Sequence, residues 1–273
     1  MNRQPAVAGT FYPRAATAVA AEAARLVAQG DDGPPAPAIA VVSPHAGWMY
    51  SGAVAGKLFA GVAIPERVLA IAPNHTGRGP RASIWSGPAG SSWQLPGLDV
   101  PVDELFVSAL RAEAPLLRAD REAHEDEHAI EVLLPLLAAR QPKLRLAAIV
   151  LGGLGFPECE ALGAAVARAI GRADGPTLIV ASSDMSHYLT DDEARATDRL
   201  ALAPLGAADA RALYDTVRAH GITMCGYIPA TVALVAARAL GATRATVVAY
   251  ATSADAGADR DRVVGYAAVR VDA

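Results

Sequence analysis

Aromatic residues, cysteines and clustered positive charge are all scarce in this chain. Aromatic residues make up only 5% of the 273 residues, against 52% for all hydrophobic residues, so we expect a core made mostly of Ala, Val and Leu. The formal net charge is -4, and the arginines are spread along the chain without forming a block. Nucleic-acid binding depends on a concentrated basic face. We therefore expect no nucleic-acid partner.

Long apolar runs are also missing. No uninterrupted apolar segment reaches the ~18 residues that a membrane-spanning helix needs, so we expect no membrane partner. Residues 1–13 contain no apolar stretch of the signal-peptide type. These features predict a cytoplasmic protein. In that compartment Cys159 and Cys225, the two cysteines, are expected to be reduced thiols rather than a disulfide.

What the chain does contain is a series of short apolar runs separated by helical patterns. Strands are expected at 38–43, 67–72, 144–151, 177–182, 243–252 and 263–271. Helices are expected at 15–30, 52–60, 103–114, 127–140, 157–170, 191–202, 207–220 and 229–240. This alternation is typical of an α/β fold whose mainly parallel central sheet is covered by helices. No linker or repeat divides residues 1–273, so we predict a single domain.

Two segments need separate comment. Residues 76–101 are rich in Gly, Pro and Ser, so we expect loops there with one or two short strands. Residues 127–140 are dense in apolar positions and contain Pro135. They are expected to form one largely buried helix with a kink at the proline.

Polar side chains follow three of the expected strands. His45 comes after the first strand, His75 after the second, and Asp184 and His187 after the fourth. In α/β sheets, ligands bind beyond the carboxyl ends of the strands. We therefore expect these four side chains, together with Cys225, to converge on one site.

The residue types at this predicted site suit a metal. Neutral imidazole and thiolate are both ligands for iron, zinc and copper. Cys225 lies just ahead of an expected helix, whose dipole would lower the pKa of the thiol and favour the thiolate. The alternative is that Cys225 is a small buried hydrophobe, and the residues alone favour neither interpretation.

Asp184 and His187 are three residues apart, just after a strand. In a helical turn this spacing would let the carboxylate orient the imidazole. A histidine held in this way could serve as a general base, so we predict a catalytic role for this pair.

One motif predicts a different chemistry. The residues from His124 to His128 match HExxH, in which two histidines one helical turn apart bind zinc and Glu125 would activate water. A polar segment precedes the motif, and no third ligand follows it at a comparable distance. The alternatives are therefore a zinc metallohydrolase, or a helix start with acidic residues in its first turn.

Seven segments of the chain carry a resemblance to a known family. These segments are VAGTFYP at 7–13, PHAGWMYSG at 44–52, APNHTG at 72–77, EDEHAIEVLLPLL at 125–137, SSDMSHY at 182–188, MCGYIP at 224–229 and VVGYAAV at 263–269. Together they resemble the Memo family, whose prokaryotic members are called AmmeMemoRadiSam system protein B. They cover nearly the whole chain in the family's order.

The resemblance implies a domain similar to the class III extradiol, LigB-like dioxygenases, which use non-haem iron. It implies that His45, His75 and Cys225 hold the metal, with iron(II) favoured over copper or zinc. Asp184 and His187 would line the same cleft, with His187 moving a proton. Extradiol dioxygenases use two histidines and a carboxylate, so the thiol is a departure that prevents a simple transfer of catechol cleavage.

The resemblance also bears on the competing motif and on partners. It places EDEHAIE in a family motif, which weakens the zinc metallohydrolase interpretation. It makes His128 and Glu131 residues near the pocket that are either structural or in contact with the metal ligands. A radical-SAM protein and an AMMECR-type protein are implied as partners. Two functions stay open: a non-haem iron-dependent, dioxygenase-like oxidoreductase acting on an unidentified small-molecule substrate, and a metal-binding or partner-recognition protein without catalysis.

Overall fold

A computed structural model of the protein describes residues 2–30 and 33–273. The strands are β1 (Ala40–Ser43), β2 (Arg67–Pro73), β3 (Ala82–Trp85), β4 (Ser92–Leu95), β5 (Leu98–Pro101), β6 (Arg118–Asp120), β7 (Arg145–Leu151), β8 (Thr177–Ser182), β9 (His187–Leu189), β10 (Arg244–Thr252) and β11 (Val263–Asp272). Within the described residues, the main sheet has the order β10-β11-β1-β8-β2-β7-β3-β6, with β9 paired to β11. Strands β4 and β5 form a separate hairpin.

The centre of the main sheet is parallel. Strands β1, β8, β2 and β7 are neighbours in that order, and every pair among them runs in parallel. Antiparallel pairs occur toward the two edges, where β11 pairs with β1 and β10, and β3 pairs with β7. The central strands are almost fully buried, as expected when helices cover both faces of a sheet. The predicted α/β fold is confirmed.

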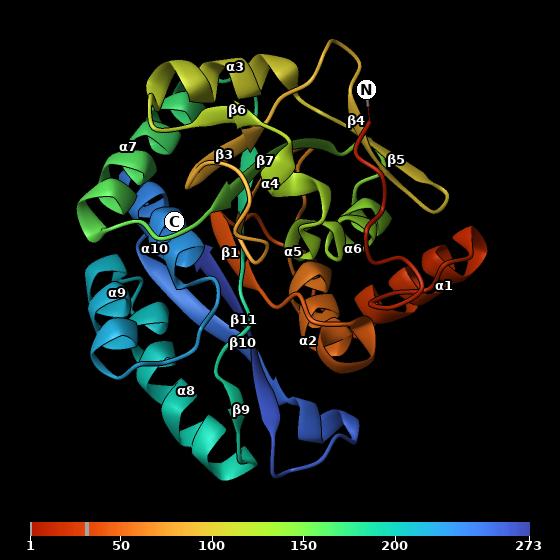
Figure 1. Ribbon diagram of the computed structural model, residues 1–273, viewed down its shortest axis with the longest axis vertical. Helices are drawn as coiled ribbons and strands as arrows, with labels where there is room; N and C mark the ends of the chain where they lie inside the picture. Colours follow the sequence, from red (N-terminus) through yellow and green to blue (C-terminus); the bar gives the residue numbers. More distant parts are fainter. Residues whose placement is uncertain (1, 31–32) are drawn as a thin grey trace.

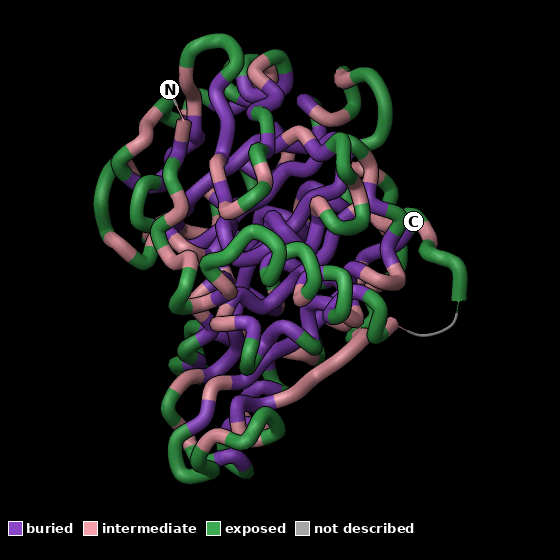
Figure 2. The backbone as a smooth tube through the Cα atoms, turned by 90° about the vertical axis from the view of Figure 1, so that its right-hand side faces the viewer, coloured by how far each residue is buried: buried purple, intermediate pink, exposed green. Residues whose placement is uncertain are grey.

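Helices cover both faces of the sheet. They are α1 (Ala16–Val27), α2 (Trp48–Ala60), α3 (Glu104–Glu113), α4 (Glu122–Glu125), α5 (His128–Glu131), α6 (Leu134–Arg140), α7 (Phe156–Arg172), α8 (Asp191–Gly206), α9 (Ala210–Ala219) and α10 (Tyr227–Ala239), with a 3-10 turn at Ser253–Ala256. Figure 1 shows α3, α7 and α9 on one side of the sheet and α1, α2, α5 and α6 on the other. In Figure 2 the buried backbone runs through the middle of the molecule, and most exposed segments lie outside it. None of the described helices is long and apolar enough to cross a membrane.

The segment 127–140 differs from its prediction. It forms two short helices, α5 and α6, instead of one helix with a kink. Pro135 lies in the first turn of α6, where its missing N–H costs no hydrogen bond. The proline therefore begins a new helix and does not bend an existing one.

Other differences concern very short elements. The segment 76–101 contains three short strands, β3, β4 and β5, where one or two were expected. The elements β6, α4 and β9 were not predicted and are only three or four residues long. A hydrophobic period cannot be recognised over so few residues, so long-range pairing alone decides their conformation.

A buried carboxylate fastens the N-terminal segment to α5. The side chain of Glu131 is fully buried and forms an ion pair with Arg3. It also accepts hydrogen bonds from the backbone N–H of Ala6 at 2.8 Å, the backbone N–H of Val7 at 3.1 Å and the hydroxyl of Tyr12 at 2.7 Å. This set of partners satisfies the carboxylate, as a buried charge requires.

We predict that Glu131→Gln lowers the free energy of unfolding by about 3–5 kcal/mol, because the buried guanidinium of Arg3 loses its counter-charge. Urea unfolding followed by circular dichroism measures this change. The matched control is Glu22→Gln, which removes an exposed ion pair with Arg25 on α1 and should cost less than about 1 kcal/mol. Equal losses in the two variants would contradict the prediction.

Candidate functional site

The predicted site residues line one cavity. The cavity has a volume of about 810 Å³, and its lining includes His45, His75, Asp184, His187 and Cys225. His45 follows β1, His75 follows β2, and Asp184 and His187 follow β8. These three parallel strands are neighbours in the sheet, so their carboxyl ends meet at the same edge. The predicted convergence of the five side chains is confirmed.

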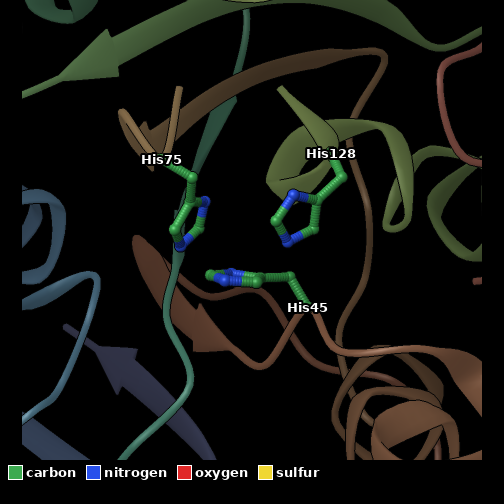
Figure 3. Close-up of side chains that lie close together, drawn as sticks. All are labelled: His45, His75 and His128. Atoms are coloured by element: carbon green, nitrogen blue, oxygen red, sulfur yellow. The ribbon is translucent and has the colours of Figure 1, made fainter. Parts of the chain in front are cut away.

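Three imidazole rings lie close together at this cavity (Figure 3). Candidate ligand atoms of His45, His75 and His128 all lie within 4.8 Å of one another. The ring centroids of His75 and His128 are 4.7 Å apart, and those of His45 and His75 are 5.1 Å apart. His128 thus lies nearer to the proposed ligands than the sequence alone indicated, because its ring belongs to this group.

The orientation of His45 follows from the partners of Ser182. The Ser182 hydroxyl donates its one hydrogen to the backbone carbonyl of Ala129 at 2.7 Å. Its oxygen, 2.7 Å from Nδ1 of His45, must then accept a hydrogen from that ring. The second nitrogen, Nε2, therefore carries a free lone pair. Burial also holds the pKa of His45 well below its ordinary value, which keeps the ring neutral and able to bind a metal.

His75 is held by Glu127, which sequence reasoning did not single out. The Glu127 carboxylate accepts hydrogen bonds from the backbone N–H of His75 at 2.7 Å and from Nδ1 of its ring at 2.9 Å. Since a carboxylate only accepts, Nε2 of His75 keeps its lone pair. Burial opposes the charged ring, but the hydrogen bond and the charge of Glu127 outweigh it and raise the pKa of His75.

His128 begins α5, directly after Glu127. Its Nδ1 lies 3.5 Å from the same Glu127 carboxylate, and its ring lies against that of Phe11, with centroids 4.8 Å apart. Burial lowers the pKa of His128. A single buried carboxylate thus lies beside two of the three imidazoles.

Cys225 reaches the site through a close backbone approach. A Cβ atom on Gly226 would lie only 2.1 Å from the backbone oxygen of Ser182, so the contact with the end of β8 requires glycine. The sulfur of Cys225 lies 3.4 Å from Nε2 of His45. The expected lowering of the thiol pKa by a helix dipole was wrong: burial, reinforced by the charge of Asp184, raises the pKa of Cys225.

Asp184 and His187 share the cavity but do not form the expected pair. Asp184 accepts a hydrogen bond from the backbone N–H of His45 at 2.8 Å, and burial raises the pKa of Asp184 to about 7. The ring of His187 donates from Nδ1 to the backbone carbonyl of Thr223 at 2.9 Å. Residues 183–186 are not helical, so the spacing of three does not bring the two side chains together. Thr223, and not Asp184, orients His187.

The HExxH motif does not form a zinc-protease helix. His124 lies on α4 and His128 on α5, with a break between the two helices. The ring of His124 is buried away from the cavity, with Nε2 2.8 Å from the hydroxyl of Ser83. Glu125 is exposed and lies near Arg121. The zinc metallohydrolase interpretation therefore fails on geometry.

Comparisons with known proteins identify the family of this chain. The model of a family described as Memo-like protein matches residues 3–270. The chain belongs to the Memo family. A MEMO1 family protein of Aquifex aeolicus is 37% identical, with 97% of each chain covered. A MEMO1 family protein of Methanothermobacter thermautotrophicus is 35% identical over 98% of this chain and 99% of its own.

A solved structure supports the fold alone. The crystal structure of an uncharacterized protein from Escherichia coli K12 matches this Memo family chain with a TM-score of 0.55 and 13% sequence identity. The match covers 85% of this chain and 98% of the other. At this identity the two proteins share an architecture, and no residue role follows from the match.

Among the described residues, Cys225 is not in the group of donors that lie within 4.8 Å of one another, but it forms with His45 a pair spaced like two ligands of one transition metal. Metal bonds of ~2.3 Å to sulfur and ~2.1 Å to nitrogen, in tetrahedral geometry, place these two donors ~3.6 Å apart. The sulfur of Cys225 and Nε2 of His45 are 3.4 Å apart, close to that value. Imidazole and sulfur donors suit iron, copper and zinc, so the donor set does not identify the ion.

We predict that Glu127→Gln weakens metal binding by about 10- to 100-fold. The neutral amide lacks the negative charge with which the carboxylate orients the ring of His75 and strengthens it as a ligand. Titration of the metal-free protein with Zn²⁺ against a chelating dye measures the affinity. Glu125→Gln is the matched control, since its exposed side chain lies two residues away and outside the cavity. Indistinguishable affinities in the two variants would contradict a role for Glu127.

Proposed function

We propose that this Memo family chain holds one redox-active metal ion, iron(II) before copper or zinc, and acts as a dioxygenase-like oxidoreductase on a small molecule. The observation that carries this proposal is the orientation of the imidazoles. Ser182 and Glu127 engage Nδ1 of His45 and His75, which leaves both Nε2 lone pairs available for a metal. The adjoining cavity of about 810 Å³ has room for a substrate.

His45, His75 and Cys225 are the ligands that we propose, and His128 completes the wall beside them. A bound iron ion would supply open coordination positions and electron transfer between a substrate and dioxygen. The sulfur would have to lose its proton when it binds the metal, which couples binding to proton release.

His187 is the proton-transfer residue in this proposal. The carbonyl of Thr223 fixes the hydrogen on Nδ1, so Nε2 can accept a proton from a substrate hydroxyl in the cavity. Burial lowers the pKa of His187, which favours the neutral, proton-accepting form. Asp184 has a positioning role, because it holds the backbone of the loop that carries His45.

The second candidate is a metal-binding or partner-recognition protein without catalysis, working with a radical-SAM protein and an AMMECR-type protein in the cytoplasm. Its support comes from the donor set. Glu127 and Asp184, two carboxylates beside the imidazoles, accept hydrogen bonds from backbone N–H groups, and neither is among the proposed ligands. The site therefore departs from the two-histidine, one-carboxylate set of non-haem iron oxygenases.

Dioxygen uptake separates the two candidates. We expect protein purified without oxygen and loaded with iron(II) to consume dioxygen in the presence of one or more members of a panel of catechols and other small aromatics. An oxygen electrode measures the rate, and metal-free protein is the blank. An iron-loaded protein that consumes no dioxygen with any member of the panel would favour the non-catalytic alternative.

The same assay tests His187. His187→Gln should retain its iron and slow uptake by about 10²- to 10⁴-fold, the usual contribution of a general base. His220→Gln, at an exposed position outside the cavity, should leave the rate unchanged. Undiminished uptake in His187→Gln would remove His187 from the proposed mechanism.

The ligand set has its own test. With Cu²⁺ or Co²⁺ as a probe, a sulfur ligand should give an intense charge-transfer absorption band that Cys225→Ser loses and His128→Gln keeps. Metal analysis after gel filtration reports occupancy in both variants. If Cys225→Ser kept the spectrum and occupancy while His128→Gln lost them, the ligands would be the three grouped histidines instead.

A further inference from the structure

Apolar side chains are exposed around the mouth of the cavity. Met49 is 72% exposed, Tyr188 is 64% exposed and Tyr50 is 37% exposed, and all three line the same cavity as the imidazoles. Phe11 lines it from the N-terminal segment. An apolar surface that stays exposed in this way usually marks a binding site. The mouth therefore suits a ligand with an apolar body.

Tyr188 is held in an unfavourable backbone conformation. Its φ angle is +65°, in the left-handed region that few residues other than glycine adopt. The residue lies in β9, which pairs with β11, and directly follows His187. Such strain costs of order 1–3 kcal/mol and tends to occur at ligand sites, where the surrounding structure maintains it. The strained backbone of Tyr188 therefore indicates that its ring is held at the mouth of the cavity for binding.

Arg262 lies against this ring. Its guanidinium carbon is 4.6 Å from the centroid of the Tyr188 ring, and its side chain also lines the cavity. Among the described lining residues it is the one lysine or arginine. No carboxylate of the described part of the chain lies within 4.0 Å of it in an ion pair, whereas Arg260, two residues away, pairs with Asp191.

The contact with Tyr188 leaves the N–H donors of Arg262 available, because within the described residues its side chain donates no hydrogen bond and forms no ion pair. A guanidinium carries five N–H donors in one plane. Those donors match the two oxygens of a carboxylate. A positive charge without a counter-charge, at the mouth of an apolar-walled cavity, attracts a negatively charged group.

We propose that the cavity binds small aromatic anions. Arg262 binds the anionic group, and the aromatic body of the ligand lies among Phe11, Tyr50 and Tyr188. Arg262 is thus a specificity-determining residue that selects charged aromatic molecules over neutral ones of the same shape. The proposal deepens the proposed function, because it names the class of substrate for the same cavity. The contacts invoked belong to the protein alone, so they exist without a metal.

Calorimetric titration of the metal-free protein with benzoate and with benzamide tests this selectivity. The two probes have nearly the same shape and differ in charge. We expect benzoate to bind at least about tenfold more tightly than benzamide, since hydrogen bonds to charged groups carry that much affinity. Arg262→Gln should remove the preference for benzoate.

Arg260→Gln is the matched control, because it removes the same charge from the same loop, at a side chain that pairs with Asp191. It should keep the preference for benzoate. Equal preferences in Arg262→Gln and the unmodified protein would overturn the role of Arg262. Inorganic phosphate binding as tightly as benzoate would overturn the aromatic part of the proposal.

Metal analysis keeps this inference separate from the proposed function. Arg262→Gln should hold as much iron as the unmodified protein, because its side chain is not among the proposed ligands. A protein that prefers benzoate but never binds iron would refute the redox function and leave the anion site standing. A protein that binds iron and consumes dioxygen without the preference for benzoate would refute only the anion site.

Discussion

Imidazoles can gather in one pocket with their lone pairs turned inward only if each carries its hydrogen on the nitrogen that faces outward. The structure meets this condition with acceptors on the surrounding elements. The Ser182 hydroxyl accepts from His45, the Glu127 carboxylate accepts from His75, and the backbone carbonyl of Thr223 accepts from His187. These acceptors determine which atoms are free for chemistry.

The single turn of α5 connects the imidazole group, the end of β8 and the N-terminal segment. His128 begins it, Glu131 ends it, and the carbonyl of Ala129 receives the hydroxyl of Ser182. Glu131 in turn fastens the N-terminal segment, which brings the ring of Phe11 against His128. The family segment EDEHAIE at 125–131 therefore acts through its packing and its hydrogen bonds, and the HExxH pattern that overlaps it is a coincidence of letters. The first histidine of that pattern, His124, lies buried beside Ser83 and away from the cavity.

The floor and the mouth of the cavity differ in chemistry. The floor holds three grouped imidazoles, of which that of His45 is buried, and the thiol of Cys225, and these donors suit a metal. The mouth holds exposed apolar side chains, a strained Tyr188 and a guanidinium without a carboxylate partner among the described residues. In the functions that we propose, metal binding and selection of the ligand therefore belong to different residues.

The sequence by itself determined the α/β fold, most strands and helices, and the placement of His45 and His75 at strand ends, because hydrophobic periodicity and chain breaks are local properties. Tertiary structure alone decided that His128 joins the imidazoles, that Glu127 holds His75, and that Thr223 replaces Asp184 as the partner of His187. These contacts join residues that are 36 to 83 positions apart in the sequence. They depend on the order of strands in the sheet and on the lengths of short helices, neither of which leaves a pattern in a local stretch of sequence.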